Sequence, residues 1–247
     1  MTAPPYSACP EVTVSGKLTV IGDLHGKLSA LEAILAERRV EEELAAGRHD
    51  LVFLGDLVDR GPTTRIGDRI VHSGADIRMR GLGVGDTSCW EGQGSIMLTR
   101  SRLGLLRRLP VALRLRVGPT IAIVVHGGAP QTEFDLALLS NALDPYQALE
   151  VGAVQEMLWA VPSWSFRSFG IGLFYTELRV RRFLEANRAR VLIRGHSNEC
   201  EMVDLGDGFW HVCVHSAQGD LSRDDGNEGY VYLAWDAPAP PELVTRL

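Results

Sequence analysis

The sequence predicts an α/β fold built around buried strands that end in charged residues. Two short apolar runs, Leu18 to Ile21 and Val52 to Leu54, are each followed directly by Gly-Asp. Between them, apolar residues at helical spacing from Leu28 to Leu35 indicate a helix. This strand-helix-strand order is typical of a βαβ unit, in which the two strands lie parallel.

Candidate metal ligands follow both strands. Because the carboxyl ends of parallel strands meet at one edge of a sheet, Asp23, His25 and Asp56 are expected to lie close together. Mixed carboxylate and imidazole ligands suit Mn, Fe or Zn better than Mg or Ca. The alternative is that these residues only cap turns between strands and helices, where Asp is common.

Length and composition are those of a soluble globular protein, and the length allows one large domain or two small ones. The chain has 247 residues, of which 45% are hydrophobic and 23% charged. Its formal net charge of -6 provides no basic surface for duplex nucleic acid. We expect one domain over residues 1–247, with a loose N-terminal arm at 1–16 and a Pro-rich tail at 237–247.

The sequence also favours a cytoplasmic protein that is not bound to a membrane. Its first residues lack the basic segment and apolar core of a signal peptide, and no apolar run approaches the ~20 residues of a membrane helix. The cysteines are too far apart for a Cys-x-x-Cys pair and are interpreted as free thiols, although a disulfide between Cys200 and Cys213 is sterically conceivable.

The remaining elements include further strands that end in histidine. Strands at Val111 to Val117 and Ile121 to Val125 lead to His126, and a strand at Arg190 to Ile193 leads to His196. The other expected elements are helices at 65–71, 101–108 and 175–187, a short strand at 76–79, a Gly-rich loop at 81–95, and a last strand pair at 209–215 and 230–235.

The order of these motifs resembles the calcineurin-like metallophosphoesterases. Within them it is similar to the phosphoprotein phosphatase branch, which includes Ser/Thr phosphatases and diadenosine tetraphosphatases. The matching signatures are Gly22-Asp-Leu-His-Gly26, Gly55-Asp-Leu-Val-Asp-Arg-Gly61, His126-Gly-Gly128 and Arg194-Gly-His196. The resemblance covers nearly the whole chain and implies a metallophosphoesterase sandwich of two mixed β-sheets flanked by helices.

The resemblance implies a centre with two divalent or trivalent metal ions. Asp23, His25 and Asp56 would hold one ion, and Asp56, His126 and His196 the other, so that Asp56 bridges them. Mn is the favoured metal, with Fe or Zn as alternatives. In such a centre a metal-bound hydroxide attacks a phosphate ester or anhydride in line.

The resemblance also implies residues that bind the phosphate. Arg60 and Arg167 match the phosphate-clamping arginines of the family, and their planar guanidinium groups suit bidentate contacts; the match of Arg167 needs a shift of one residue. Asp59 matches the residue that orients the histidine of a further motif.

That further motif, Gly-Asn-His followed by Glu or Asp, is missing, because the chain has no Asn between residues 61 and 140. Its Asn would bind the second metal and its His would protonate the leaving oxygen. Either Arg80 to Val84 or Gly85 to Ser88 takes its place; the first placement is favoured because Arg-Gly follows the strand, as in the relatives.

Other residues could replace the functions of the missing motif. Asp86 is a candidate replacement ligand, and His215 or His72 a candidate proton donor. His215 also has a simpler interpretation as a core histidine.

The predicted activity is that of a metal-dependent phosphoric ester hydrolase. Its binding site for the second metal and its general acid would differ from those of the family. Its partner would be a phosphorylated small molecule or a phosphoprotein. Because general acid catalysis contributes ~10²- to 10⁴-fold, a substrate with an acidic leaving group would suffer least from the missing histidine. Two alternatives are a weakened pseudophosphatase that binds a phospho-ligand or protein, and a metalloenzyme repurposed for a non-phosphate small molecule.

Overall fold

A computed structural model describes residues 7–14, 16–56, 64–66, 69–71, 110–142, 148, 150–164, 173–219 and 229–246. The strand expected at 76–79, the Gly-rich loop at 81–95 and the helix at 101–108 lie outside these described residues.

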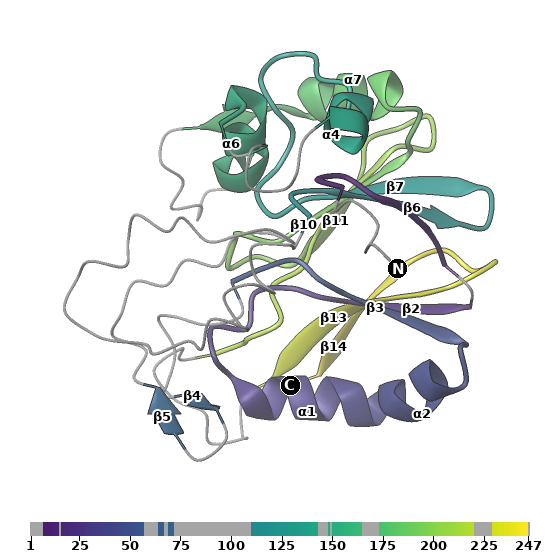
Figure 1. Cartoon of the computed structure of the whole chain (residues 1–247), viewed down its shortest axis with the longest axis vertical. Helices are drawn as coiled ribbons and strands as arrows, with labels where there is room; N and C mark the ends of the chain where they lie inside the picture. The colour runs from purple at the N-terminus through teal and green to yellow at the C-terminus, as the bar shows by residue number, and fades with distance from the viewer. Residues whose placement is uncertain are drawn as a thin grey trace.

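Two β-sheets face each other at the centre of the molecule (Figure 1). The larger has the strand order β1 (Glu11–Thr13), β6 (Leu113–Val117), β7 (Thr120–Val124), β10 (Val191–Arg194), β12 (Trp210–Cys213), β11 (Glu201–Asp204). The smaller has the order β14 (Glu242–Arg246), β13 (Tyr230–Asp236), β2 (Lys17–Ile21), β3 (His49–Phe53). Two smaller pairs are antiparallel β4 (Thr64–Ile66) with β5 (Arg69–Val71), and parallel β8 (Val161–Pro162) with β9 (Phe174–Tyr175).

Both sheets are mixed, and the strands that lead to candidate ligands are parallel within each sheet. In the smaller sheet β2 pairs with β3 in parallel, with Val20 opposite Val52. In the larger sheet β10 is parallel to both β7 and β12. The βαβ unit predicted from the sequence is therefore confirmed, with α1 (Leu28–Glu37) as its crossover helix.

The space between the sheets is filled by apolar side chains. Strand β6 shows the pattern most clearly, because Leu113, Leu115 and Val117 are buried in this interior, whereas Arg114 and Arg116 on the other face pair with Glu11. Further members of the same cluster are Leu18, Val20, Val52, Leu54, Ala122, Val124, Val191, Ile193, Val212, Val214, Leu233 and Trp235.

Helices cover the outer face of each sheet (Figure 1). On the larger sheet lie α4 (Ala137–Ala142), α6 (Gly152–Trp159) and α7 (Glu177–Ala186), whose apolar residues join one core cluster with Ile123 and Leu192. On the smaller sheet lie α1 and α2 (Val40–Ala45), with Ala30 and Ile34 of α1 packed near Ile21. The predicted sandwich of two mixed sheets flanked by helices is therefore confirmed. None of the helices in the described part of the chain has the length and apolar character needed to cross a bilayer.

Three predicted elements differ from the structure. The segment expected to be helical at 65–71 contributes instead to the antiparallel β4–β5 pair, in agreement with its β-branched residues. The last two predicted strands do not pair along their lengths, because β12 belongs to the larger sheet and β13 to the smaller. The C-terminal tail contains an edge strand, β14, that pairs with β13.

The cysteines that the structure describes are free thiols, as expected. Cys9 and Cys213 are buried and Cys200 is partly exposed, and no disulfide joins Cys200 to Cys213. Burial raises the pKa of Cys200 to about 11, although its contacts with the His215 backbone and Gln218 oppose this rise. The Cys200 thiol is therefore a poor nucleophile at neutral pH.

Candidate metal centre

Six candidate metal ligands gather at the edge of the sandwich where the carboxyl ends of five strands meet. They are Asp23 and His25 after β2, Asp56 after β3, His126 after β7, His196 after β10 and His215 after β12. They form two groups, and within each group the candidate ligand atoms lie within 4.8 Å of one another. The first group, Asp23, His25 and His215, is called the Asp23 group; the second, Asp56, His126 and His196, is called the Asp56 group.

The Asp23 group is buried throughout. Relative exposure is 2% for Asp23, 1% for His25 and 4% for His215. The Nδ1 atom of His215 lies 3.6 Å from Oδ2 of Asp23, and the rings of His25 and His215 have their centroids 5.9 Å apart. Burial alone would raise the pKa of Asp23, but the three neighbouring histidines, His215 first among them, hold that pKa below its ordinary value. Asp23 is therefore a carboxylate, the form that binds metal.

In the Asp56 group, His126 lies close to both other members. Its Nε2 atom lies 3.1 Å from Nδ1 of His196 and 3.7 Å from Oδ2 of Asp56. Its Nδ1 atom lies 3.1 Å from the Leu54 carbonyl oxygen, a contact that is a hydrogen bond only if Nδ1 donates. The lone pair of His126 then resides on Nε2 and faces the other two ligands, as in metal-binding histidines oriented by a backbone carbonyl.

The two groups are adjacent. Oδ2 of Asp56 is 3.9 Å from Nε2 of His25, and Oδ1 of Asp23 is 4.0 Å from Nδ1 of His126. Each group offers one carboxylate and two imidazoles, a donor set suited to Mn, Fe or Zn. The residues present therefore fit the two metal ions that the sequence resemblance implies.

Three of the six candidate ligands have a strained backbone. His25, Asp56 and His196 have φ angles of 49°, 43° and 56°, in the left-handed region that non-glycine residues rarely adopt. Such conformations cost about 1–3 kcal/mol each and persist where surrounding contacts enforce them. One such contact is the Asp56 carbonyl, which accepts hydrogen bonds from the backbone N–H groups of Leu24 and His25. The fold therefore maintains strain at the positions from which the ligands project.

Arg194 connects the loops that carry two of the candidate ligands, His126 and His196. It is fully buried and donates to the carbonyl oxygens of Gly127 at 2.5 Å and His196 at 3.0 Å. The His196 backbone N–H in turn donates to the carboxylate of Asp23, at 2.9 Å from Oδ2. The motif Arg194-Gly-His196 was noted in the sequence, but nothing in a linear pattern reveals that its arginine is a buried connector.

Several predicted site residues lie outside the part of the chain that the structure describes. They are the phosphate-clamping candidates Arg60 and Arg167, the orienting residue Asp59, the replacement ligand Asp86 and the proton-donor candidate His72. Their roles stay predictions. His215, predicted as a candidate proton donor or a core histidine, lies beside Asp23 and His25.

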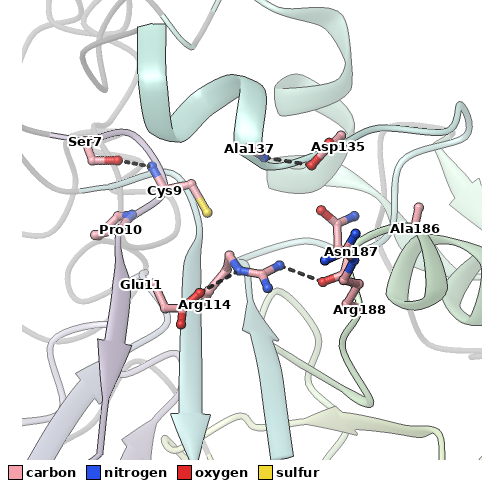
Figure 2. A pocket seen from close by; sticks show the side chains of 10 residues that line it. All are labelled: Ser7, Cys9, Pro10, Glu11, Arg114, Asp135, Ala137, Ala186, Asn187 and Arg188. Carbon is pink, nitrogen blue, oxygen red and sulfur yellow. Dashed lines mark hydrogen bonds and ion pairs between the residues drawn. The ribbon is translucent and has the colours of Figure 1, made fainter.

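A separate pocket of about 680 Å³ lies at the β1 edge of the larger sheet, beside α4 and the end of α7 (Figure 2). Its polar groups are largely paired with one another. Arg114 contacts Glu11 and donates to the Asn187 carbonyl, while the Asn187 side chain accepts from the Leu136 N–H and donates to the carbonyls of Phe134 and Phe183. The pocket contains none of the six candidate ligands, so we assign it no role in the chemistry.

Comparison with known proteins agrees with this site. Residues 16–79 match the family model described as calcineurin-like phosphoesterase. These residues include the first two signatures and three of the six candidate ligands, Asp23, His25 and Asp56. No curated protein sequence matches the chain.

Solved structures show where the fold occurs. A protein serine/threonine phosphatase from Saccharomyces cerevisiae with similarity to human phosphatase PP5 is 19% identical, with a TM-score of 0.58, over 98% of this chain and 83% of that one. A putative diadenosine tetraphosphatase is 14% identical, with a TM-score of 0.44, over 98% of this chain and 99% of that one. The yeast phosphatase establishes the fold, and the second likeness adds no argument.

The resemblance inferred from the motifs is confirmed: residues 16–79 match the calcineurin-like phosphoesterase model, and the chain shares its sandwich fold with the yeast serine/threonine phosphatase.

Proposed function

We propose that this protein hydrolyses phosphate esters or anhydrides at a centre of two metal ions, one held by Asp23, His25 and Asp56 and the other by Asp56, His126 and His196. The observation that carries this proposal is the convergence of two carboxylates and three imidazoles from four strand ends on one edge of the sandwich. Two metal ions, when bound, lower the pKa of a water molecule and neutralise charge on the phosphoryl oxygens.

The residues of the chain would contribute position and charge. The Asp56 carboxylate lies within 4 Å of His25 in the Asp23 group and of His126 in its own group. It is therefore the residue proposed to contact both ions. The Leu54 carbonyl keeps Nε2 of His126 directed at the site, and the Asp23 carboxylate holds the His196 loop through its backbone N–H. These contacts fix the ligands before substrate arrives, which is the preorganisation that catalysis requires.

The substrate proposed is a phosphorylated small molecule or a phosphoprotein. Arg60 and Arg167 are proposed to bind its phosphate and Asp86 to supply a further ligand, while Asp59 matches the residue that orients the missing histidine. Because the general-acid histidine of the related phosphatases is missing from the sequence, the preferred leaving group would be acidic, such as a phenol or a phosphate. The metal proposed is Mn, with Fe or Zn as alternatives.

The test combines metal content with hydrolysis. Protein purified without a metal-affinity tag is analysed by elemental mass spectrometry, and turnover of p-nitrophenyl phosphate is measured with and without added Mn. We expect two equivalents of metal and Mn-dependent turnover, reduced at least about 100-fold in Asp56→Asn, because altering even an outer-shell partner of a metal ligand typically costs 10- to 100-fold.

The matched control is Asp207→Asn. Asp207 is an exposed carboxylate that pairs with Arg181 on the surface, so its loss should leave turnover unchanged. Protein that binds no metal and shows no turnover with Mn, Fe or Zn would refute the proposed hydrolase.

A further inference from the structure

We propose that His215 is a metal ligand, and that its Nδ1 atom binds the ion held by Asp23 and His25. This inference rests on the metal centre of the proposed function and changes the role of His215 from proton donor to ligand. It gives the first ion a third protein ligand of its own, in addition to any contact with Asp56.

The loop after β12 is tied directly to the loop after β2. The backbone N–H of Gly22 donates to Oγ of Ser216 at 2.8 Å. In return, the backbone N–H groups of Ser216 and Ala217 donate to the Asp23 carbonyl at 3.1 and 2.9 Å. Three hydrogen bonds thus join the residues that flank His215 to the residues that carry Asp23.

Gly22 allows these two segments to approach so closely. A Cβ atom at this position would overlap the carbonyl group of Val214, which is backbone and has little room to move. The absence of a side chain at Gly22 therefore brings an element of the larger sheet against an element of the smaller one. The juxtaposition of His215 and Asp23 follows from this contact between the sheets.

The backbone of His215 is also fixed from the other side. Its N–H donates to Sγ of Cys200 at 3.1 Å, and its carbonyl accepts from Nε2 of Gln218 at 2.7 Å. Gln218 is in turn held by Lys27, whose Nζ donates to its carbonyl at 2.5 Å. The position of the imidazole is therefore set by contacts on both sides.

The imidazole itself has the properties of a ligand. His215 is 4% exposed, and its Nδ1 makes no hydrogen bond with any residue that the structure describes. The nearest carboxylate oxygen, Oδ2 of Asp23, is 3.6 Å away, which is beyond a hydrogen bond. Two ligands at ~2.0–2.2 Å from one ion commonly lie 3–3.6 Å apart, so a shared cation accounts for this spacing.

The assignment also makes the two groups chemically equivalent. In the related phosphatases the missing motif supplies an Asn to the second ion, and this sequence lacks it. With His215 as a ligand, each group supplies one carboxylate and two imidazoles, and the Asp56 carboxylate is proposed to contact the first ion as well. The centre has then gained a ligand at the first ion and lost one at the second, so the first ion is expected to bind more tightly.

The test follows the imidazole nitrogens by NMR during a zinc titration. Metal-stripped protein labelled with ¹⁵N in histidine is titrated with Zn²⁺, and long-range ¹H–¹⁵N spectra report which ring nitrogens become coordinated. The His215 signal is assigned by its absence in His215→Gln. The matched control is His211→Gln, which removes a buried histidine within β12 whose Nε2 contacts the Tyr175 hydroxyl at 2.8 Å.

We expect four imidazoles to become coordinated, with the His215 signal shifting at the first equivalent of Zn²⁺. In His215→Gln the affinity of one of two sites should fall about 10-fold or more, whereas His211→Gln should leave both affinities unchanged. Coordination of only three imidazoles in the wild-type protein would overturn the assignment, and this readout stands even if the variant does not fold.

The outcomes separate this inference from the proposed function. If wild-type protein binds no zinc, both are wrong. If two ions bind and His215→Gln retains both affinities, only the role of His215 is wrong. If four imidazoles coordinate zinc but no phosphate ester is hydrolysed with any metal, the ligand assignment holds and the hydrolase proposal fails.

Discussion

The two groups of candidate metal ligands are held in place in different ways. Both groups draw members from both sheets, but the Asp23 group is deeply buried and its loops are joined by hydrogen bonds of the Gly22 and Asp23 backbone with Ser216 and Ala217. The Asp56 group has one partly exposed member, His196, and is held largely by side chains, with Arg194 linking the loops of His126 and His196.

This difference indicates how each group can be disrupted separately. The Asp23 group should be sensitive to steric changes where the sheets meet, and the Asp56 group to loss of the buried guanidinium. Changes elsewhere in the fold should alter stability without removing metal. The predictions below are ordered by the size of the expected effect.

Arg194→Met should have the largest effect. It leaves the carbonyl groups of Gly127 and His196 without their charged donor in a fully buried site, and each hydrogen bond to a charged group contributes ~1.5–3 kcal/mol. We expect the free energy of unfolding to fall by about 3 kcal/mol or more, and the Asp56 group to lose its ion first. Urea unfolding and Mn stoichiometry measure the two effects.

The control for this prediction is Arg181→Met. Arg181 also donates to a backbone carbonyl, that of Leu205, but it does so on α7 near the surface and far along the chain from any ligand. In Arg181→Met the free energy of unfolding should fall by less than about 1 kcal/mol, and both ions should be retained. Equal losses of unfolding free energy and of bound Mn in Arg194→Met and Arg181→Met would contradict the connecting role of Arg194.

Gly22→Ala should disrupt the Asp23 group. The added methyl group overlaps the Val214 carbonyl and separates the loop of His215 from that of Asp23. Overpacking of this kind costs ~1–3 kcal/mol, and we expect Mn stoichiometry to fall from two to one. Gly152→Ala is the control, since nothing lies within 4 Å of a Cβ at that position. Two retained ions in Gly22→Ala would show that the sheet contact does not position the group.

His211 should give a pH dependence that is independent of metal. Burial, with the charge of Arg194, lowers the pKa of His211 well below its usual value, so the folded protein keeps this ring neutral. Below about pH 6.5 the unfolded chain binds a proton that the folded protein does not, and stability falls as the pH is lowered, by up to ~1.4 kcal/mol per pH unit. Urea unfolding in EDTA at several pH values should show that the free energy of unfolding declines less steeply with falling pH in His211→Gln than in the wild-type protein. Identical slopes in the two proteins would contradict this role of His211.

Glu11→Gln should have the smallest effect. Glu11 pairs with Arg116 and Arg114 at the exposed β1 edge, and these contacts lower its pKa. Exposed pairs contribute ~0–1 kcal/mol, so thermal unfolding should shift only slightly. Mn stoichiometry should stay at two; a lost ion would show that the β1 edge is coupled to the metal centre.

The sequence was informative where local pattern determines structure. The Gly-Asp that ends each of the first two strands predicted the parallel pair and the position of Asp23 and Asp56, because a buried strand delivers the next residue to the sheet edge. His126 and His196 were found in the same way, since each follows a recognisable apolar run. The fold class followed from the same strands and from the family motifs.

The sequence was less informative where contacts between distant elements decide the outcome. Strands β12 and β13 are consecutive in the chain, yet they belong to different sheets, which no local pattern reveals. For the same reason the proximity of His215 to Asp23 could not be seen, because it depends on Gly22 and Ser216 meeting across the sandwich. The segment at 65–71 was assigned to a helix because short apolar runs are ambiguous between helix and strand.

The most direct test of the metal centre is a crystal structure of the Mn-loaded protein with anomalous diffraction measured at the manganese edge. We predict two anomalous peaks about 3.5–4 Å apart, one between Asp23, His25 and His215 and the other between Asp56, His126 and His196. An absence of peaks at this edge of the sandwich in fully loaded protein, or a single peak bound elsewhere, would contradict the two-metal account.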